Sequence, residues 1–181
     1  MASEEIKKFD QALYVMYTND AVNEYNTTKL NLLCNKDNEN SVRSCRIDAE
    51  HNSKKAANQS AKLMWNLESY IIISKGCKVM ITSNVCTIQG LTNGTLATVR
   101  HIIYDINKSP PSLPSSIILE MDNNYTGADL NSSYGTRRFN RFVSIQPIVA
   151  YVQAGDYLER TQYPLRLAYA STIHKCQGII K

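Results

Sequence analysis

The sequence lacks the residue spacing that a structural zinc site needs. None of its five cysteines forms a C-x-x-C pair, and its three histidines stand far apart in the chain. Structural zinc sites take their ligands from closely spaced Cys and His pairs, so this class of small domain is excluded. The cysteine count is odd, and the opening residues MASEEIKKFD do not resemble a secretory signal peptide. We therefore expect reduced thiols in an intracellular protein.

A membrane span and a phosphate-binding loop are also missing. No apolar run of the sequence approaches the ~20 residues that cross a bilayer. The pattern G-x-x-x-x-G-K-[ST], whose backbone and lysine hold the β- and γ-phosphates of a nucleotide, occurs nowhere in the chain. Phosphoryl transfer depends on such groups for positioning and charge stabilisation. We expect no cofactor in this chain and no ATP hydrolysis by this polypeptide alone.

The charge of the chain is only mildly positive. Twenty Lys and Arg residues stand against sixteen Asp and Glu residues in a chain of 181 residues. The length allows one ordinary domain or two small ones, each with a hydrophobic core. The positive excess permits a polyanionic partner without requiring one.

The first third of the chain is typical of an α/β domain. An apolar run at 11–17 predicts a strand, and helically spaced apolar residues at 22–33 predict a helix. Asn19 or Asp20 can accept hydrogen bonds from the first N–H groups of that helix. Residues 35–62 are polar and predict a long surface connection, with room for a short helix, that leads into a more helical stretch at 61–69.

The middle of the chain is typical of β-structure. Between about 71 and 153, short runs rich in β-branched residues are divided by Gly, Pro and Asn, which predicts a small all-β barrel or sandwich. Asn93-Gly94 stands between two apolar runs and predicts a hairpin. After this module, residues 163–172 (YPLRLAYAST) predict one strand that is buried on both faces apart from Arg166.

A polar cluster follows that last strand. Its members are Thr172, His174, Lys175 and Gln177, with Gly178 directly after. They stand at the carboxyl end of a strand, where α/β sheets place their ligand crevices. The hydroxyl, imidazole, ammonium and amide groups can all donate to phosphate oxygens. An ordinary solvated turn is the alternative interpretation.

Three segments of the sequence resemble one helicase group. Residues 162–178 (QYPLRLAYASTIHKCQG) resemble the segment ending in motif V of superfamily 1B DNA helicases of the petite-integration-frequency (PIF) and RecD-like type. Residues 75–99 (KGCKVMITSNVCTIQGLTNGTLATV) resemble the start of the Src-homology-3-like barrel inserted in those proteins. Residues 13–30 (LYVMYTNDAVNEYNTTKL) resemble a strand and helix near the start of their second motor domain. The three segments follow the order of the family.

The resemblance implies a fold class and a domain division. The fold would be α/β, a partial RecA-like motor domain of the P-loop NTPase type with an inserted small all-β barrel. Residues 1–70 would open the second motor domain, 71–153 would form the barrel, and 154–181 would return to the motor domain just past motif V. Cys176 stands where the family often has serine, a small change that the fold should tolerate.

The resemblance also implies site residues and partners. The channel for single-stranded DNA would be lined by Thr18, Asn19, Thr172, His174 and Lys175, mainly through contacts with phosphates. Gln177 and Gly178 would lie near the ATP cleft between two motor domains. ATP and Mg²⁺ are implied for the complete helicase, whose N-terminal motor domain would be supplied by a longer chain or be absent. In a eukaryote the family works in the nucleus or the mitochondrion.

Two further motifs each allow two interpretations, one functional and one structural. In GTRRFNRF, Arg137 and Arg141 alternate with aromatic residues, which suits contact with DNA or an ordinary barrel strand with a charged outer surface. In IILEMD, Glu120 and Asp122 follow an apolar strand as magnesium ligands would, but a plain barrel strand is favoured.

Three hypotheses for the whole chain remain open. It is the C-terminal-side portion of an ATP-dependent 5′–3′ DNA helicase, a motor-less module that binds single-stranded nucleic acid, or a truncated gene product without function.

Overall fold

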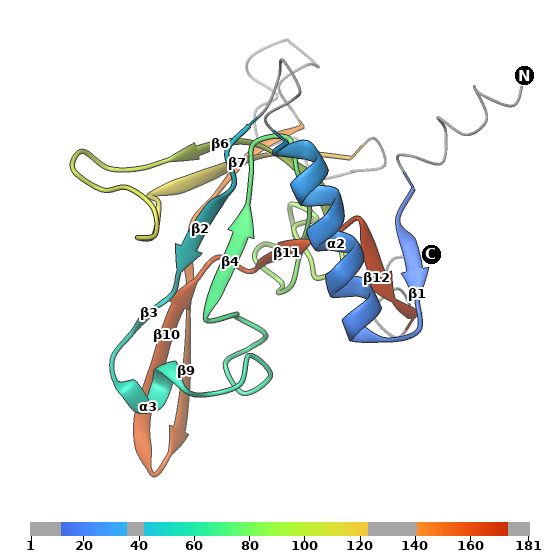
Figure 1. Ribbon diagram of the computed structural model, residues 1–181. Coiled ribbons are helices and arrows are strands. Elements are labelled where there is room, and N and C mark those ends of the chain that lie inside the picture. The colour runs from blue at the N-terminus through green and yellow to red at the C-terminus, as the bar shows by residue number, and fades with distance from the viewer. Residues whose placement is uncertain (1–11, 36–41, 123–140, 174–181) are drawn as a thin grey trace, which may run out of the picture.

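The chain folds into a sheet-rich α/β structure, seen in the computed structural model of Figure 1. The structure describes residues 12–35, 42–122 and 141–173. The helices of this part are α2 (Asn19–Leu33) and α3 (Lys54–Ala57). Its strands are β1 (Tyr14–Met16), β2 (Cys45–Asp48), β3 (Glu50–His51), β4 (Tyr70–Ile73), β5 (Lys78–Ile81), β6 (Leu96–Ile103), β7 (Ser116–Met121), β8 (Phe142–Ile145), β9 (Ile148–Ala154), β10 (Asp156–Gln162), β11 (Leu165–Leu167) and β12 (Ala170–Thr172). The predicted α/β class is confirmed. Neither described helix is long and apolar enough to cross a bilayer.

The predicted strand and helix at the start of the chain are present as β1 and α2. The helix turns one face to the core, where Asn26 and Leu30 are buried. Its cap differs from the prediction, because Thr18 and not Asn19 or Asp20 takes this role. The hydroxyl oxygen of Thr18 accepts a hydrogen bond of 3.2 Å from the backbone N–H of Ala21. Thr18 is the last extended residue before the helix, which is the position that favours a capping side chain.

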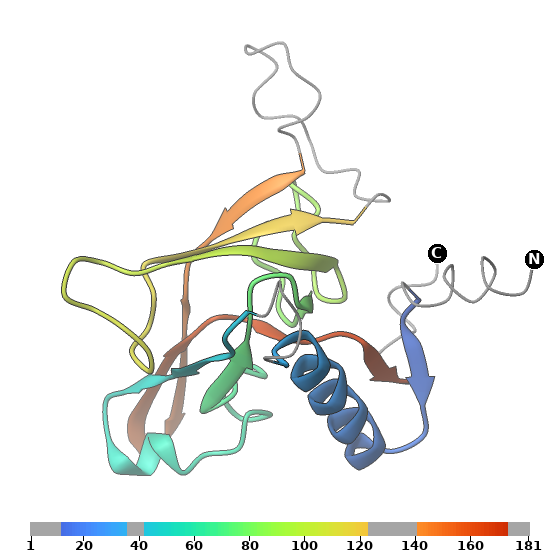
Figure 2. The same ribbon diagram turned by 45° about the horizontal axis from the view of Figure 1, so that its top comes forward.

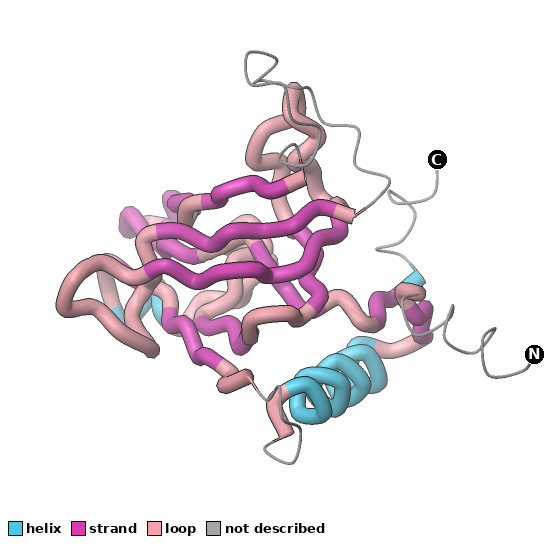
Figure 3. The backbone as a smooth tube through the Cα atoms, turned by 90° about the horizontal axis from the view of Figure 1, so that it is seen from above, coloured by secondary structure: helices cyan, strands magenta, loops and turns pink. Residues whose placement is uncertain are grey.

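The largest sheet has five antiparallel strands in the order β11-β5-β6-β7-β8. Figure 3 shows long strands of the molecule lying side by side. Alternate residues of β7 and of the first half of β6 are buried in the main core, as the period of a strand with one covered face requires. Strand β5 buries three consecutive residues, Val79, Met80 and Ile81. In the described part, β8 and β11 each pair with one neighbour, so these strands form an open sheet. The sheet takes in most of the module predicted at 71–153 together with β11. The boundaries of the three predicted domains stay a prediction.

The IILEMD motif lies in β7 and has a structural role. The Glu120 carboxylate forms ion pairs with Arg100 of β6 and with Arg141, the latter at 3.7 Å. Across the three described ranges, no group of three or more His, Cys, Asp or Glu residues could hold a metal ion. The interpretation of this motif as a plain strand therefore fits the structure.

Residues 35–62 contain two strands that the sequence analysis missed. Strand β2 pairs antiparallel with β4, and β3 pairs with β10 in the three-stranded sheet β3-β10-β9. Ile47 is the one fully buried apolar residue of β2. A single buried residue produces no alternating pattern, so the strand left no signal in the sequence.

Residues 61–69 form turns in place of the predicted helical stretch. Met64 and Leu67 are fully buried in a second core against β9, β10 and α3. Their spacing of three residues imitates a helix, but the backbone at Trp65 and Asn66 has φ values of 53° and 62°. These left-handed conformations end any helix.

The hairpin predicted at Asn93-Gly94 has a much longer connection than a two-residue turn. Strands β5 and β6 do pair antiparallel, but all of residues 82–95 connect them. Gly94, at φ 95°, donates a backbone hydrogen bond of 2.9 Å to Ile81 and so only closes the end of that loop. Within this connection, the backbones of Cys86 and Leu91 form an isolated antiparallel β-bridge.

The single strand predicted at 163–172 is two strands. β11 runs antiparallel to β5, whereas β12 runs parallel to β1 (Figure 2). The break falls at Ala168 and Tyr169, where the chain leaves the five-stranded sheet and passes beside α2. Both strands are largely buried, so their apolar runs merged into one in the sequence.

Candidate functional site

Two parallel strands bring distant polar residues to one edge. In the pairing of β1 with β12, Tyr14 lies opposite Ala170 and Met16 lies opposite Thr172. Parallel strands end at the same edge of a sheet, and ligands of α/β proteins bind beyond such carboxyl ends. Thr18 and Asn19 stand two and three residues after the end of β1, and Thr172 ends β12.

A buried side chain of α2 fixes the path of the chain between β11 and β12. The side-chain amide of Asn26 donates to the carbonyl oxygens of Leu167 at 3.4 Å and Ala170 at 3.2 Å. Its oxygen accepts from the backbone N–H groups of Tyr169 at 3.0 Å and Ala170 at 2.8 Å. These four bonds satisfy backbone groups that the break in the strand leaves without ladder partners. They also hold β12, and with it Thr172, against the helix.

A cavity of about 450 Å³ lies between α2, β4 and the β11–β12 segment. Asn19 and Thr172 both line it, so the structure brings these two predicted site residues together. Arg166 lines the same cavity. Its guanidinium group donates to the hydroxyl oxygen of Ser171 at 3.2 Å and to the sulfur of Met80 at 3.1 Å. The other described residues that line the cavity are Val22, Asn23, Asn26, Thr27, Glu68, Ser69, Tyr70, Ile71, Ile72, Ile73, Leu165 and Leu167.

The remaining predicted site residues have different positions. Thr18 is exposed and caps α2 beside Asn19. Arg141 lies just before β8 on the five-stranded sheet, where its guanidinium group donates to the carbonyl oxygen of Met121 at 3.1 Å. Arg141 does not line the cavity. Five predicted site residues lie outside the described residues: Arg137, His174, Lys175, Gln177 and Gly178.

Two residues of the site were missed by the sequence analysis. Asn26 shares the apolar face of its helix with Val22 and Leu30. A polar residue on an apolar face indicates a buried hydrogen-bonding role, and this is the signal by which Asn26 could have been found. Arg166 interrupts an otherwise apolar strand, and a buried-strand cation is a comparable signal.

Two titratable groups near this part of the chain, Tyr169 and Cys77, keep their protons at neutral pH. Burial raises the pKa of Tyr169 to about 12, so its phenol stays protonated at neutral pH. Burial likewise raises the pKa of the Cys77 thiol to about 12, and a thiol that keeps its proton is a poor nucleophile. The described part of the cavity offers amide, hydroxyl and guanidinium donors together with the carboxylate of Glu68. The donors are suited to binding phosphate oxygens.

Comparisons with known proteins find similar sequences and similar folds. No family model matches the chain. The chain is 29% identical over 146 residues to an ATP-dependent DNA helicase, PIF7, of Trypanosoma brucei brucei, a match that covers 74% of this chain and 15% of that protein. Among solved structures, the Pif1 helicase of Candida albicans matches with a TM-score of 0.63 at 18% identity, over 94% of this chain and 40% of that one. Bacteroides Pif1 bound to single-stranded DNA matches with a TM-score of 0.56 at 21% identity, over 92% of this chain and 32% of that one.

The chain therefore spans a small part of its curated relative and well under half of these two solved structures. The structural matches confirm the fold, and the match in sequence confirms the relationship inferred from the three motifs. The polar edge formed by β1 and β12 carries two of those motifs. The chain is thus similar in sequence to part of a PIF-type helicase and similar in fold to part of the solved Pif1 helicases.

Proposed function

We propose that this chain is a portion of an ATP-dependent 5′–3′ DNA helicase and that it contributes the grip on single-stranded DNA. One observation carries the proposal: the parallel pairing of β1 with β12 places Asn19 and Thr172 at one cavity, together with Arg166. Relatives with this fold include a helicase bound to single-stranded DNA.

The grip would act mainly on the sugar-phosphate backbone. Arg166 supplies positive charge and a planar set of donors that matches phosphate geometry. Asn19 and Thr172 add neutral donors at the same cavity. His174 and Lys175 stand two and three residues after β12 in sequence and would extend this surface with further donors. Contacts of this kind do not distinguish bases, as a translocating motor requires.

ATP would act through the complete helicase. A related Bacteroides structure holds ADP-AlF4. We propose that Gln177 and Gly178 couple the strand-binding edge to an ATP and Mg²⁺ site completed by another motor domain. Contact of Arg137 and Arg141 with DNA remains a prediction. For a eukaryotic protein of this type, the nucleus and the mitochondrion are the compartments that hold its substrate.

The proposal is tested by the affinity of the chain for a labelled single-stranded oligonucleotide at several salt concentrations. Each neutralised phosphate contributes a salt slope of about −0.7 for a single strand. Arg166→Gln should weaken binding at low salt and reduce the slope by roughly one such contribution. Arg100→Gln removes the same charge from the five-stranded sheet and should leave the slope unchanged. No binding at low salt, or equal effects of the two variants, would contradict the proposal.

A further inference from the structure

Three exposed aromatic side chains form a row outside the cavity. Trp65, Tyr151 and Tyr157 are 45%, 55% and 57% exposed. The ring centroids of Trp65 and Tyr151 lie 5.1 Å apart, and those of Tyr151 and Tyr157 lie 6.3 Å apart with an angle of 22° between the ring planes. We call these three residues the aromatic row. Solvent exposure of three large neighbouring rings is unfavourable unless a partner covers them.

The row stands on the outer face of the β9–β10 hairpin. The inner face of this hairpin packs into the second core through Ala150 and Leu158. Tyr151 pairs across the strands with Glu159, and Tyr157 pairs with Gln153, so all four side chains share the outer face. Strand alternation therefore fixes the direction of both tyrosine rings.

Trp65 is held beside Tyr151 by a strained turn. Trp65 and Asn66 both have left-handed backbone conformations. Such conformations are unfavourable in free energy for any residue other than glycine. Met64 and Leu67 on either side are fully buried, so the core anchors the turn. Backbone strain of this kind persists where the surrounding packing imposes it. In this turn, the strained backbone directs the indole of Trp65 outward.

A buried arginine secures the turn from behind. Arg160 has no exposed surface, and its guanidinium group donates to the carbonyl oxygens of Leu67 and Gln59, both at 2.8 Å. It also donates to Ala56 at 3.1 Å and Ala57 at 3.2 Å. One side chain thus ties α3 and the Trp65 turn to β10. The aromatic row is therefore a surface built on a rigid support.

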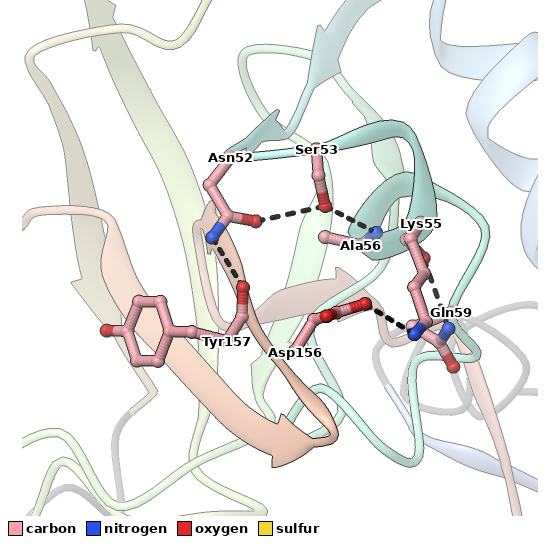
Figure 4. Close-up of polar contacts among 7 residues, drawn as sticks. All are labelled: Asn52, Ser53, Lys55, Ala56, Gln59, Asp156 and Tyr157. Atoms are coloured by element: carbon pink, nitrogen blue, oxygen red, sulfur yellow. Dashed lines mark hydrogen bonds and ion pairs between the residues drawn. The ribbon is translucent and has the colours of Figure 1, made fainter.

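The far end of the row is tied down as well. The amide of Asn52 donates to the carbonyl oxygen of Tyr157 at 2.9 Å, and Lys55 pairs with Asp156 at 2.6 Å (Figure 4). The ring of Tyr157 points away from these contacts. The polar contacts hold the hairpin tip, while the Tyr157 ring stays more than half exposed beside Tyr151.

We propose that the aromatic row is a second contact surface for single-stranded nucleic acid, on which the bases of the strand stack. The Trp65 turn leads directly into Glu68, Ser69 and Tyr70, which form a wall of the cavity. A strand that leaves the cavity along this wall would reach Trp65 first. Aromatic rings in a row accept successive bases regardless of sequence, because every base has a π-face. This inference rests on the proposed grip at the cavity.

The charges around the row determine the mode of contact. Glu159 lies on the same face and accepts a hydrogen bond from the Tyr157 hydroxyl at 3.3 Å, and Glu50 of β3 pairs across from Thr161 on that face. Carboxylates repel phosphates, so the phosphates of the strand would point away from the sheet. The row should add affinity through stacking and little salt dependence.

The test uses the full chain and an oligothymidylate of about 16 nucleotides, at the upper end of known single-strand site sizes. Trp65 is the one tryptophan of the sequence, so its fluorescence reports directly on the row. We expect quenching of Trp65 on binding. Tyr151→Ala should weaken the affinity about fivefold or more, the low end of losses measured for base–aromatic stacking, without changing the salt slope. Tyr151→Phe keeps the ring and should bind like the original chain.

The outcomes separate the two proposals. If the oligonucleotide binds with a normal salt slope but leaves Trp65 fluorescence and the Tyr151→Ala affinity unchanged, the stacking surface is wrong and the cavity grip stands. If no oligonucleotide binds at low salt, the proposed function itself fails, and the stacking surface with it. Quenching by an arginine-rich peptide in place of the oligonucleotide would assign the row to a basic protein partner and would overturn the inference.

Discussion

Two buried polar side chains, Asn26 and Arg160, organise the backbone near the functional surfaces. Each bonds with main-chain groups at a place where regular structure stops. Unpaired backbone groups inside a protein cost free energy comparable to a lost hydrogen bond, so these side chains decide whether the irregular segments are stable. At the scale of single residues, position depends on such bonds more than on hydrophobic burial.

Replacing Asn26 with alanine should destabilise the protein strongly. The change removes four hydrogen bonds and leaves buried backbone groups of Leu167, Tyr169 and Ala170 without partners. We expect a loss of roughly 2–4 kcal/mol in the free energy of unfolding, because each such group left unpaired costs about 1–3 kcal/mol. Urea unfolding measures the loss. Asn23→Ala, at an exposed position of the same helix, should stay within about 0.5 kcal/mol; similar losses for both variants would contradict this role of Asn26.

Single residues also show what the sequence could reveal about the site. Asn19 and Thr172 were recognised through motifs and do meet at one cavity. Arg166 was noticed as an exception in an apolar strand, but its place beside them depends on the break between β11 and β12. That break follows from hydrogen bonds to Asn26, which lies more than a hundred residues away in sequence. Local patterns carry no information about such a contact.

Among the elements, α2 shows how a local signal sets a boundary. Its first turn is capped by the hydroxyl of Thr18, and Asp20 in the same turn lies near the positive end of the helix dipole. The helix packs against β12 and β1, so its start also sets the position of Asn19 at the cavity edge (Figure 2). The helical spacing of its apolar residues and the short apolar strand before it made this element predictable from sequence, although the capping residue was predicted wrongly.

Thr18→Ala should shorten or fray the start of α2. Loss of a capping hydroxyl costs about 1 kcal/mol, and we expect that decrease in the free energy of unfolding. Thr18→Ser keeps the hydroxyl and should restore most of the stability. Chemical denaturation of the three proteins decides the matter; an alanine variant as stable as the serine variant would show that the hydroxyl does not cap the helix.

Strands β2 and β3 illustrate the opposite case. They bury little apolar surface of their own, and their pairing partners β4 and β10 lie far along the chain. Strands of this kind form because a partner strand offers them backbone hydrogen bonds, and not because of a pattern in their own sequence. The sequence therefore predicted the central strands of the β-module well, but not the strands added around it.

For the whole molecule, several buried acids should make stability fall at alkaline pH. Burial raises the pKa of Cys77 from 9.0 to about 12 and that of Tyr169 from 10.0 to about 12, and it also raises the pKa values of Tyr104 and Tyr163. The folded state then holds protons that the unfolded state has already released. Stability is complete below the unfolded pKa values, near 9 to 10, and is lost as pH rises toward 12.

Urea unfolding at pH 8 and at pH 11 should therefore give a lower midpoint at pH 11. Tyr169→Phe removes one of the titrating groups and should reduce the difference between the two midpoints. A midpoint that is the same at both pH values would show that these groups are accessible to solvent in the folded protein.

The molecule as a whole combines a small strand–helix unit, made of β1, β12 and α2, with an extensive sheet. The proposed strand-binding cavity lies where the chain passes from β11 of the sheet to β12 of the strand–helix unit. The most direct test of this account is photo-crosslinking of a bromodeoxyuridine-substituted single strand to the chain, followed by identification of the crosslinked peptides. The account predicts crosslinks within residues 18–27 and 165–178 at the cavity, and the stacking proposal adds crosslinks at Trp65, Tyr151 and Tyr157. Crosslinks confined to the β6–β8 strands of the five-stranded sheet would contradict it.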